Sequence, residues 1–161
     1  MFQYVVLGSY EEALKVFTGS GDTQFTAGAS QIIASDARLL AGIAQCRLNN
    51  YEDASSQFMN VRRVSNHYGL AYLLEAEMLW AQRKDAMPAF RQFQQTYQAD
   101  LLAPFAAAVM NGEFGCKDLF DSAKTRQIME KYGSLKSADI ALTLTALAPT
   151  ATVQPAATPT P

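Results

Sequence analysis

The chain has 161 residues, a formal net charge of −2, and a composition that is 49% hydrophobic and 17% charged. A chain of this length suits one domain that buries about 70% of its unfolded surface, and the composition is typical of a globular protein. The charge gives no electrostatic footprint for nucleic acid, and the basic pair Arg62-Arg63 is expected at a solvated helix end. No run of 18 apolar residues indicates a membrane span. Neither nucleic acid nor a membrane is therefore expected as a partner.

The two cysteines, Cys46 and Cys116, lie within helical patterns. A disulfide framework needs more cysteines at loop positions, so both are expected to be buried, reduced thiols. The stretch Met1–Leu7 has a short apolar run with no charged region before it, and it is not expected to be a secretory leader. These observations predict a cytoplasmic or nuclear location.

Residues 1–7 are expected to be the end of a helix whose beginning is missing, because the first helix of a hairpin normally has about 11–14 residues. This predicts either that the chain is a fragment or that the helix pairs with another protein. Gly8-Ser9 makes a turn, and the next helix ends at the breaker cluster 18–22. Residues 23–34 have the weak pattern of a short helix, or of the leading part of a longer one.

The pair Ser35-Asp36 predicts the start of the following helix, because a hydroxyl can accept from an orphan N–H and a carboxylate favours the positive dipole end. Apolar residues at 3–4 spacing continue the helix to Leu48. Gly42 lies inside it and costs about 1 kcal/mol relative to Ala, which indicates a close contact with another helix. Asn49-Asn50 ends the helix, and the next one carries Ala54.

A third pair of helices is predicted from residue 65 onward. Ser65-Asn66 starts a helix that is apolar around most of its circumference and is therefore expected to be central. Its partner starts near Asp85, and Pro88 falls in the first turn, where its missing N–H would have no partner. The buried stripe of that partner is expected to be Phe90, Phe93 and Tyr97.

A fourth hairpin is expected to begin at Asp100 and to turn at 111–114, and its second helix follows that turn and runs through Leu119 and Phe120 to Tyr132-Gly133. One face of its first helix is expected to pack inward: Leu101, Leu102, Phe105, Ala106 and Val109. A last amphipathic segment spans 135–147. Residues 149–161 are rich in Pro, Thr and Ala and are expected to be a disordered tail, which leaves 1–148 as a helical-repeat domain.

One motif, a turn followed by the start of a helix, occurs three times. Each copy places a small Ala four residues before a Phe: Ala13/Phe17, Ala54/Phe58 and Ala86/Phe90. At 3.6 residues per turn both side chains share one face, so a neighbouring helix can approach the Ala and pack beside the ring. The copies are separated by irregular intervals near the ~34 residues of a tetratricopeptide repeat. The predicted fold is all-α, a right-handed α-α superhelix of tetratricopeptide-like helical hairpins.

The residues that could carry chemistry are few. His67 is the only histidine, and no Cys or His pair has metal-ligand spacing. Glu11-Glu12 and Glu52-Asp53 are paired carboxylates, but they stand at expected helix N-termini, where acids stabilise the macrodipole. No catalytic, cofactor or metal site is expected, and an enzyme acting through His67 is the least favoured reading.

A peptide-binding groove is the better candidate, because the first helix of each hairpin lines the concave face of a tetratricopeptide array. The expected protein-binding residues are Asp36, Leu39, Ile43 and Arg47 in the second hairpin, and Tyr68, Glu75 and Met78 in the third. The chaperone-tail clamp needs Lys and Asn where Leu39 and Ile43 stand, so the sequence does not support that clamp. The apolar residues predict a groove filled by a helix, either a partner's or one of this chain, while ordinary packing between repeats remains open for each of them.

The segment Arg38–Ala54, with Phe58, places a Gly-Ile-Ala helix before a Tyr turn and an Ala···Phe helix. Tyr68–Ala71 then starts a helix, and Asp100–Leu102 leads to the turn Asn111–Phe114. In this order the motifs resemble the helical-repeat half of PCI-domain proteins, which are subunits of the COP9 signalosome and the proteasome lid. The family's winged-helix module has no counterpart here, so the resemblance implies a partial or diverged member.

The resemblance implies a non-catalytic scaffold in a cullin-deneddylating complex, whose metal chemistry belongs to another subunit. The residues themselves predict a protein–protein interaction scaffold that is a subunit of a multiprotein complex. The alternative is a free-standing tetratricopeptide adaptor or co-chaperone that binds a peptide segment. In both readings the partners are proteins.

Overall fold

The computed structural model describes residues 1–19, 31–64, 68–96 and 100–146. Within these ranges the chain forms nine α-helices and one 3-10 turn and contains no β-strand, which confirms the all-α class. The predictions for Ser65-Asn66, His67, Tyr97, most of 23–34 and the tail 149–161 fall outside the described residues. Among the described helices, none combines the length and the apolarity needed to cross a lipid bilayer.

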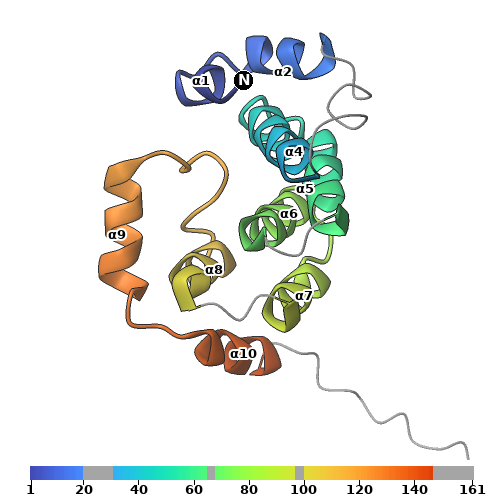
Figure 1. Ribbon diagram of the computed structural model, residues 1–161. Helices are drawn as coiled ribbons and strands as arrows, with labels where there is room; N and C mark the ends of the chain where they lie inside the picture. Colours follow the sequence, from blue (N-terminus) through green and yellow to red (C-terminus); the bar gives the residue numbers. More distant parts are fainter. Residues whose placement is uncertain (20–30, 65–67, 97–99, 147–161) are drawn as a thin grey trace, which may run out of the picture.

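Most helices that are neighbours in the sequence pack against each other (Figure 1). In chain order the elements are α1 (Phe2–Val6), α2 (Tyr10–Gly19), α4 (Gln31–Arg47), α5 (Tyr51–Val64), α6 (Gly69–Ala81), α7 (Met87–Thr96), the 3-10 turn η1 (Asp100–Leu102), α8 (Ala103–Met110), α9 (Ser122–Tyr132) and α10 (Ser137–Ala146). The helices α4 to α7 follow one another down one side of the molecule, and α9 stands on the opposite side. α10 closes the lower end by packing on α7 and α8.

The three Ala···Phe pairs are buried, as the sequence motif predicts. Ala13 and Phe17 lie on α2, Ala54 and Phe58 on α5, and Phe90 on α7 with Ala86 just before its first turn. The turns before these helices also follow the prediction: Gly8 and Asn49 adopt left-handed backbone conformations, with φ of 80° and 64°. Glycine and asparagine tolerate that region better than other residues, which explains their presence there.

Helix α6 is the centre of the fold, as its all-round apolar pattern indicates. Its residues Ala71–Ala76 are all buried, and it packs against α5, α7 and α8. Leu73 belongs to a core shared with α7, α8 and α10, whereas Leu74 belongs to a second core shared with α4 and α5. The helix therefore joins the two halves of the molecule.

The predicted start of α4 at Ser35-Asp36 is wrong, because the helix begins one turn earlier, at Gln31. Ser35 is completely buried inside the helix and caps nothing. The reason is packing against α2: Ala37 and Ala41 form a small-residue face on which Phe17 lies. The extra turn adds Ala34, which lies three residues before Ala37 on the same face and is also buried, and this burial stabilises the turn beyond what the capping preference of Ser35 provides.

The prediction that the helix after the 111–114 turn includes Leu119 and Phe120 is also wrong, because α9 begins at Ser122. The side chain of Asp121 caps α9 by accepting hydrogen bonds from the backbone N–H groups of Ala123 (2.9 Å) and Lys124 (3.0 Å). Residues 115–121 form a loop instead, and Phe120 in it has a left-handed φ of 68°. We call this segment the 115–121 loop.

Two smaller predictions about exposure are corrected. Leu101, expected on the packed face of the fourth hairpin, is 73% exposed because it lies in the 3-10 turn before α8. Arg62, expected at a solvated helix end, is partly buried and forms an ion pair with the buried Glu75 of α6, and its Nη2 donates to Glu75 Oε1 at 3.0 Å.

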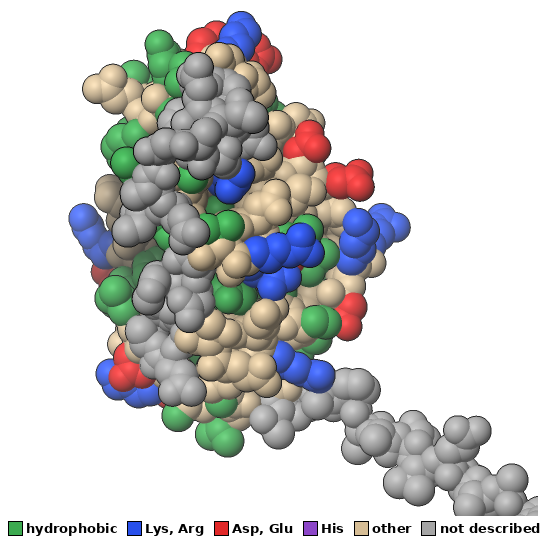
Figure 2. All heavy atoms as spheres, turned by 45° about the vertical axis from the view of Figure 1, so that its right-hand side comes forward, with side chains coloured by type: hydrophobic (Ala, Val, Ile, Leu, Met, Phe, Trp, Pro, Cys, Tyr) green, Lys and Arg blue, Asp and Glu red, His purple; other side chains and the backbone are tan. Residues whose placement is uncertain are grey.

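On the face in Figure 2, Lys and Arg side chains gather near the middle, with Asp and Glu side chains above and below them.

Replacing Ala54 by Leu should destabilise the fold by about 1–3 kcal/mol, because the added atoms have no space in a full core. Ala54 is completely buried where α5 packs on α4. Urea denaturation measures the change, and Ser56→Leu on the exposed side of the same helix is the matched control. An unchanged midpoint for Ala54→Leu would mean that Ala54 is not at a helix–helix contact.

Candidate interaction groove

An apolar hollow of about 480 Å³ lies between α1, α4, the start of α6 and the 115–121 loop. Its walls are almost entirely aliphatic and aromatic, with one carboxylate at the edge: Phe2, Asp36, Leu39, Leu40, Ile43, Leu70, Leu119 and Phe120. We call it the apolar groove. A hollow of this size and lining suits several apolar side chains of a ligand.

Two exposed aromatic rings stand at the groove. Phe2 on α1 is 57% exposed and Phe120 on the loop is 51% exposed, and their ring centroids lie 6.0 Å apart in an edge-to-face arrangement. Phe120 is the more unusual of the two, because its positive φ is a strained conformation for a bulky residue. Backbone strain of this kind is retained where the surrounding structure enforces it, and it is enriched at ligand sites.

A second, polar hollow of about 300 Å³ adjoins the groove and shares Leu119 and Phe120 with it. Two cations line it, Arg47 at the end of α4 and Lys117 on the loop, against one carboxylate, that of Asp121, so its charge is positive on balance. Arg47 stacks over the ring of Tyr10 at 5.7 Å, and Lys117 over the ring of Tyr51 at 5.9 Å. Within the described part of the chain neither cation forms an ion pair. The groove therefore has an apolar floor with positive charge at one end.

The prediction of reduced cysteines is wrong: Cys46 of α4 and Cys116 of the 115–121 loop form a disulfide. The two residues are 70 positions apart, with Cα atoms at 6.4 Å, and both are completely buried. The sequence argument failed because it placed Cys116 in a helix, whereas the fold brings its loop back onto α4. No local spacing of the two cysteines could reveal this contact.

Hydrogen bonds hold the loop beside the disulfide. The N–H of Cys116 donates to Glu77 Oε2 of α6 at 2.7 Å, and Arg47 Nη2 donates to the carbonyl of Leu119 at 2.8 Å. Lys117 Nζ donates to Asn49 Oδ1 at 2.8 Å. The loop is thus fixed to α4 and α6 and to the turn before α5, and these contacts position Leu119 and Phe120 at the groove.

Glu77 is an ionisable group at this junction. Burial raises its pKa to about 7, the N–H of Cys116 acts in the opposite direction, and the negative charge of Asp118 adds to the rise. A side chain at Gly115 would collide with the Glu77 carboxyl group, so the loop needs glycine there. Cys46, Cys116 and Glu77 bring possible metal-ligand atoms within 4.8 Å of one another, but the disulfide occupies both sulfurs.

The structure brings together part of the predicted binding set. Asp36, Leu39 and Ile43 line the apolar groove, and Arg47 lines the polar hollow. Tyr68 lies at the edge, where its hydroxyl donates to Asp36 Oδ1 at 2.6 Å; burial and this hydrogen bond raise its pKa to about 12.

The other two predicted residues do not reach the groove. Glu75 is buried and pairs with Arg62, and Met78 is completely buried in the core. The predicted set also lacks five residues that line the groove: Phe2, Leu40, Leu70, Leu119 and Phe120. For Phe2 and Phe120 the sequence offers one signal: neither phenylalanine occupies a position of the Ala···Phe motif, so neither is assigned to the core by it.

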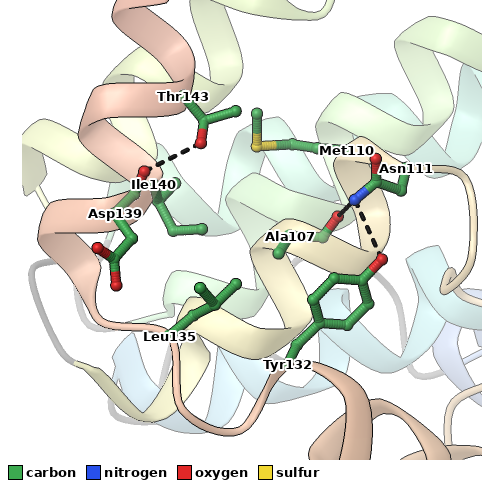
Figure 3. Close-up of a pocket in the computed structure, with 8 residues that line it drawn as sticks. All are labelled: Ala107, Met110, Asn111, Tyr132, Leu135, Asp139, Ile140 and Thr143. Atoms are coloured by element: carbon green, nitrogen blue, oxygen red, sulfur yellow. Dashed lines mark hydrogen bonds between the residues drawn. The ribbon is translucent and has the colours of Figure 1, made fainter.

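A further hollow, of about 180 Å³, lies between α8, α9 and α10 (Figure 3). Asn111 spans its rim, with its Nδ2 donating to the carbonyl of Ala107 at 2.9 Å and to the Tyr132 hydroxyl at 3.1 Å. Leu135 and Ile140 supply apolar walls, as Figure 3 shows. The hollow is smaller than the apolar groove and has no exposed aromatic ring at its mouth, so it is the weaker candidate site.

In comparisons with known proteins, no family model, curated protein or solved structure matches this chain. The resemblance to PCI-domain subunits stays a sequence-based hypothesis. The function of the chain is therefore inferred from its own residues and from the geometry of the groove.

Proposed function

We propose that the chain is a non-catalytic protein–protein interaction scaffold, a subunit of a multiprotein complex, whose hairpins form a tetratricopeptide-like right-handed superhelix. The proposal includes the PCI-like kind of assembly that the motifs between Arg38 and Phe120 resemble. Successive helix pairs that pack on their neighbours support the repeat architecture. Each pair in such an array packs mainly on adjacent pairs and leaves one surface for partners. In this chain the 115–121 loop departs from that pattern, because it also contacts α1 and α4.

The observation that carries the proposal is Phe120. A large apolar side chain that is half exposed gains little from burial, and its left-handed backbone adds a conformational cost of about 1–3 kcal/mol. The loop nevertheless holds the ring at the groove, opposite the exposed Phe2. A partner that covers both rings would recover the missing burial, at about 25 cal/mol for each Å² of apolar surface.

The partner that fits is an apolar segment of another protein, presented as a short amphipathic helix with an acidic residue at one end. The apolar side chains would enter between Leu39 and Phe120, and the carboxylate would reach Arg47 and Lys117. Helices in grooves are recognised through such anchors at i, i+3, i+4 and i+7. Opposite charge at the rim increases the association rate and selects the orientation of the helix.

Replacing Phe120 by Asn should weaken binding of such a peptide at least about tenfold, because loss of an aromatic anchor typically costs 2 kcal/mol or more. Asn adopts positive φ readily, so the backbone of the loop is kept and the fold should lose little stability. The measurement is isothermal titration with a peptide selected from a displayed library on the wild-type chain.

The matched control is Leu101→Asn, because Leu101 is also a large exposed apolar residue but lies in η1, away from the groove. It should bind the peptide like the wild type. Equal affinities for the wild type and Phe120→Asn would place the peptide elsewhere. Failure to select any peptide with apolar and acidic residues would contradict the proposed occupant.

The second candidate is a free-standing tetratricopeptide adaptor or co-chaperone that binds a peptide segment. The small size of the apolar groove, about 480 Å³, favours this alternative, because it accommodates one short segment. The two candidates differ in stoichiometry. A scaffold is recovered with several subunits in near-equal amounts, whereas an adaptor is recovered with one chaperone or one client.

A further inference from the structure

The 115–121 loop forms one wall of the apolar groove, and a single covalent bond ties it to the rest of the fold. Cys116, at the start of the loop, is bonded to Cys46 of α4, and Leu119 and Phe120 follow within four residues. The remaining ties described above are hydrogen bonds to Glu77, Arg47 and Asn49. The position of Phe120 therefore depends on the state of the Cys46–Cys116 pair.

The disulfide lies beside a group that can exchange protons. A carboxylate oxygen of Glu77 and both sulfurs lie within 4.8 Å of one another. Burial keeps the Glu77 pKa near 7, so a fraction of the side chain is protonated at neutral pH. A neutral carboxylic acid next to a disulfide can protonate the sulfur that leaves when the bond is attacked.

We infer that the Cys46–Cys116 disulfide is a redox latch for the groove: the oxidised chain holds the 115–121 loop in place, and reduction by a dithiol releases the loop and weakens partner binding. The inference rests on the proposed function and adds its regulation. It assigns to the disulfide a role in the groove beyond stabilising the fold.

The exchange balances in atoms and electrons. A thiolate of the dithiol attacks one sulfur, the S–S bond breaks, and the other sulfur leaves with the electron pair and takes a proton from Glu77. The second thiol of the reductant then loses its proton, which restores the Glu77 proton through solvent, and attacks the mixed disulfide. The protein sulfur in that bond leaves with the electron pair and takes up the proton that the first thiol of the reductant released to solvent when it ionised. The products are two protein thiols and the cyclic disulfide of the reductant. Because both cysteines are completely buried, the attack requires a transient local fluctuation that exposes one sulfur while the S–S bond is still intact, and the loop is released only after that bond breaks.

The test compares the oxidised chain with the chain reduced by dithiothreitol, with thiol alkylation and mass spectrometry confirming each state. Trypsin cleavage after the exposed Lys117 reports on the loop without any partner, and reduction should accelerate it at least about tenfold if the loop opens locally. Affinity for the selected peptide should fall about tenfold if only a tenth of the reduced molecules keep a formed groove. Circular dichroism should show that the helices persist.

The variant Cys46→Ser/Cys116→Ser should behave like the reduced chain with or without dithiothreitol, whereas Leu101→Asn should respond to dithiothreitol like the wild type. Equal cleavage rates in both redox states would overturn the latch even if the peptide binds. Loss of the helices on reduction would also overturn it, because the disulfide would then only stabilise the fold.

If the reduced chain takes up Zn²⁺ and still binds the peptide, then Cys46, Cys116 and Glu77 form a metal site instead of a latch. If the oxidised chain binds no peptide, the proposed function fails, and the Lys117 cleavage rate still decides whether the loop is redox-controlled.

Discussion

Replacing Gly42 by Val should lower the free energy of unfolding by about 3 kcal/mol, the upper part of the range for overpacked cores. A Cβ at Gly42 would lie 2.5 Å from Cε1 and 2.9 Å from Cδ1 of the Phe58 ring. Phe58 is completely buried between α4 and α5, so the ring has no free space into which it can move. The two helices must separate, and contacts along their whole interface weaken. The thermal midpoint should fall by about 6–12 °C for a chain of this size.

Gly19→Val is the matched control, because among the residues that the structure describes no atom lies within 4 Å of a Cβ added at Gly19. The same substitution there carries the change in helix propensity without the collision, and it should alter stability by at most about 1 kcal/mol. Equal losses for the two variants would mean that Gly42 is required for its backbone alone and that the close approach of α4 and α5 has no energetic role.

The wild type should lose stability as pH rises from 4.5 to about 7. Replacing Glu77 by Gln should abolish this pH dependence. Burial is the main cause of the Glu77 pKa near 7, with Asp118 adding to it, whereas the N–H of Cys116 and the charges of Lys117 and Arg47 oppose it. In the unfolded chain the carboxyl group has its ordinary pKa of 4.5. Between these two values the folded state binds more protons than the unfolded state, so stability falls as pH rises.

The contribution of Glu77 to stability is therefore fully present below pH 4.5 and is lost as pH rises through about 7. A difference of about 2.5 pKa units corresponds to about 3 kcal/mol, which is the upper limit of the effect. Glu77→Gln keeps an oxygen that can accept a hydrogen bond from the N–H of Cys116. The free energy of unfolding of this variant should therefore not change with pH between 5 and 8. Urea denaturation between pH 5 and 8 measures it.

Glu113→Gln is the control of opposite sign, because the hydrogen bond from Lys131 lowers the pKa of the exposed Glu113. Its stabilisation is present above the unfolded pKa of 4.5 and is lost only as pH falls below that value, so Glu113→Gln should leave the pH dependence between 5 and 8 unchanged. A wild type whose stability is constant from pH 5 to 8 would show that Glu77 is solvated and ionised throughout.

Local chemistry explains why much of the helix order could be predicted. The Ala···Phe pairs, the turns at Gly8 and Asn49 and the early Pro88 each depend on residues within one turn of each other. The errors arose where a distant contact overrides a local preference. Ser35 is a good cap by type, but packing of Ala37 and Ala41 on Phe17 continues the helix through it.

The groove was predictable only on its helical side. Asp36, Leu39, Ile43 and Arg47 share one face of α4, and a helical period alone places them together. The opposite wall comes from the 115–121 loop, whose path depends on Cys46, Glu77 and Arg47, each at least 38 positions away in the sequence. Contacts of this separation leave no periodic pattern in the sequence, so Phe120 could not be identified from it.

The interaction scaffold is tested most directly by a quantitative pull-down of the tagged chain from its source cells, read by mass spectrometry, with Phe120→Asn and Leu101→Asn as parallel baits. The account predicts that the wild type and Leu101→Asn recover the same set of subunits in near-equal amounts and that Phe120→Asn loses them. Recovery of PCI-domain and metalloprotease-like subunits would assign the complex to the kind that the sequence resembles. A wild type that recovers no partner, or a Phe120→Asn bait that recovers the same partners as the wild type, would contradict the account.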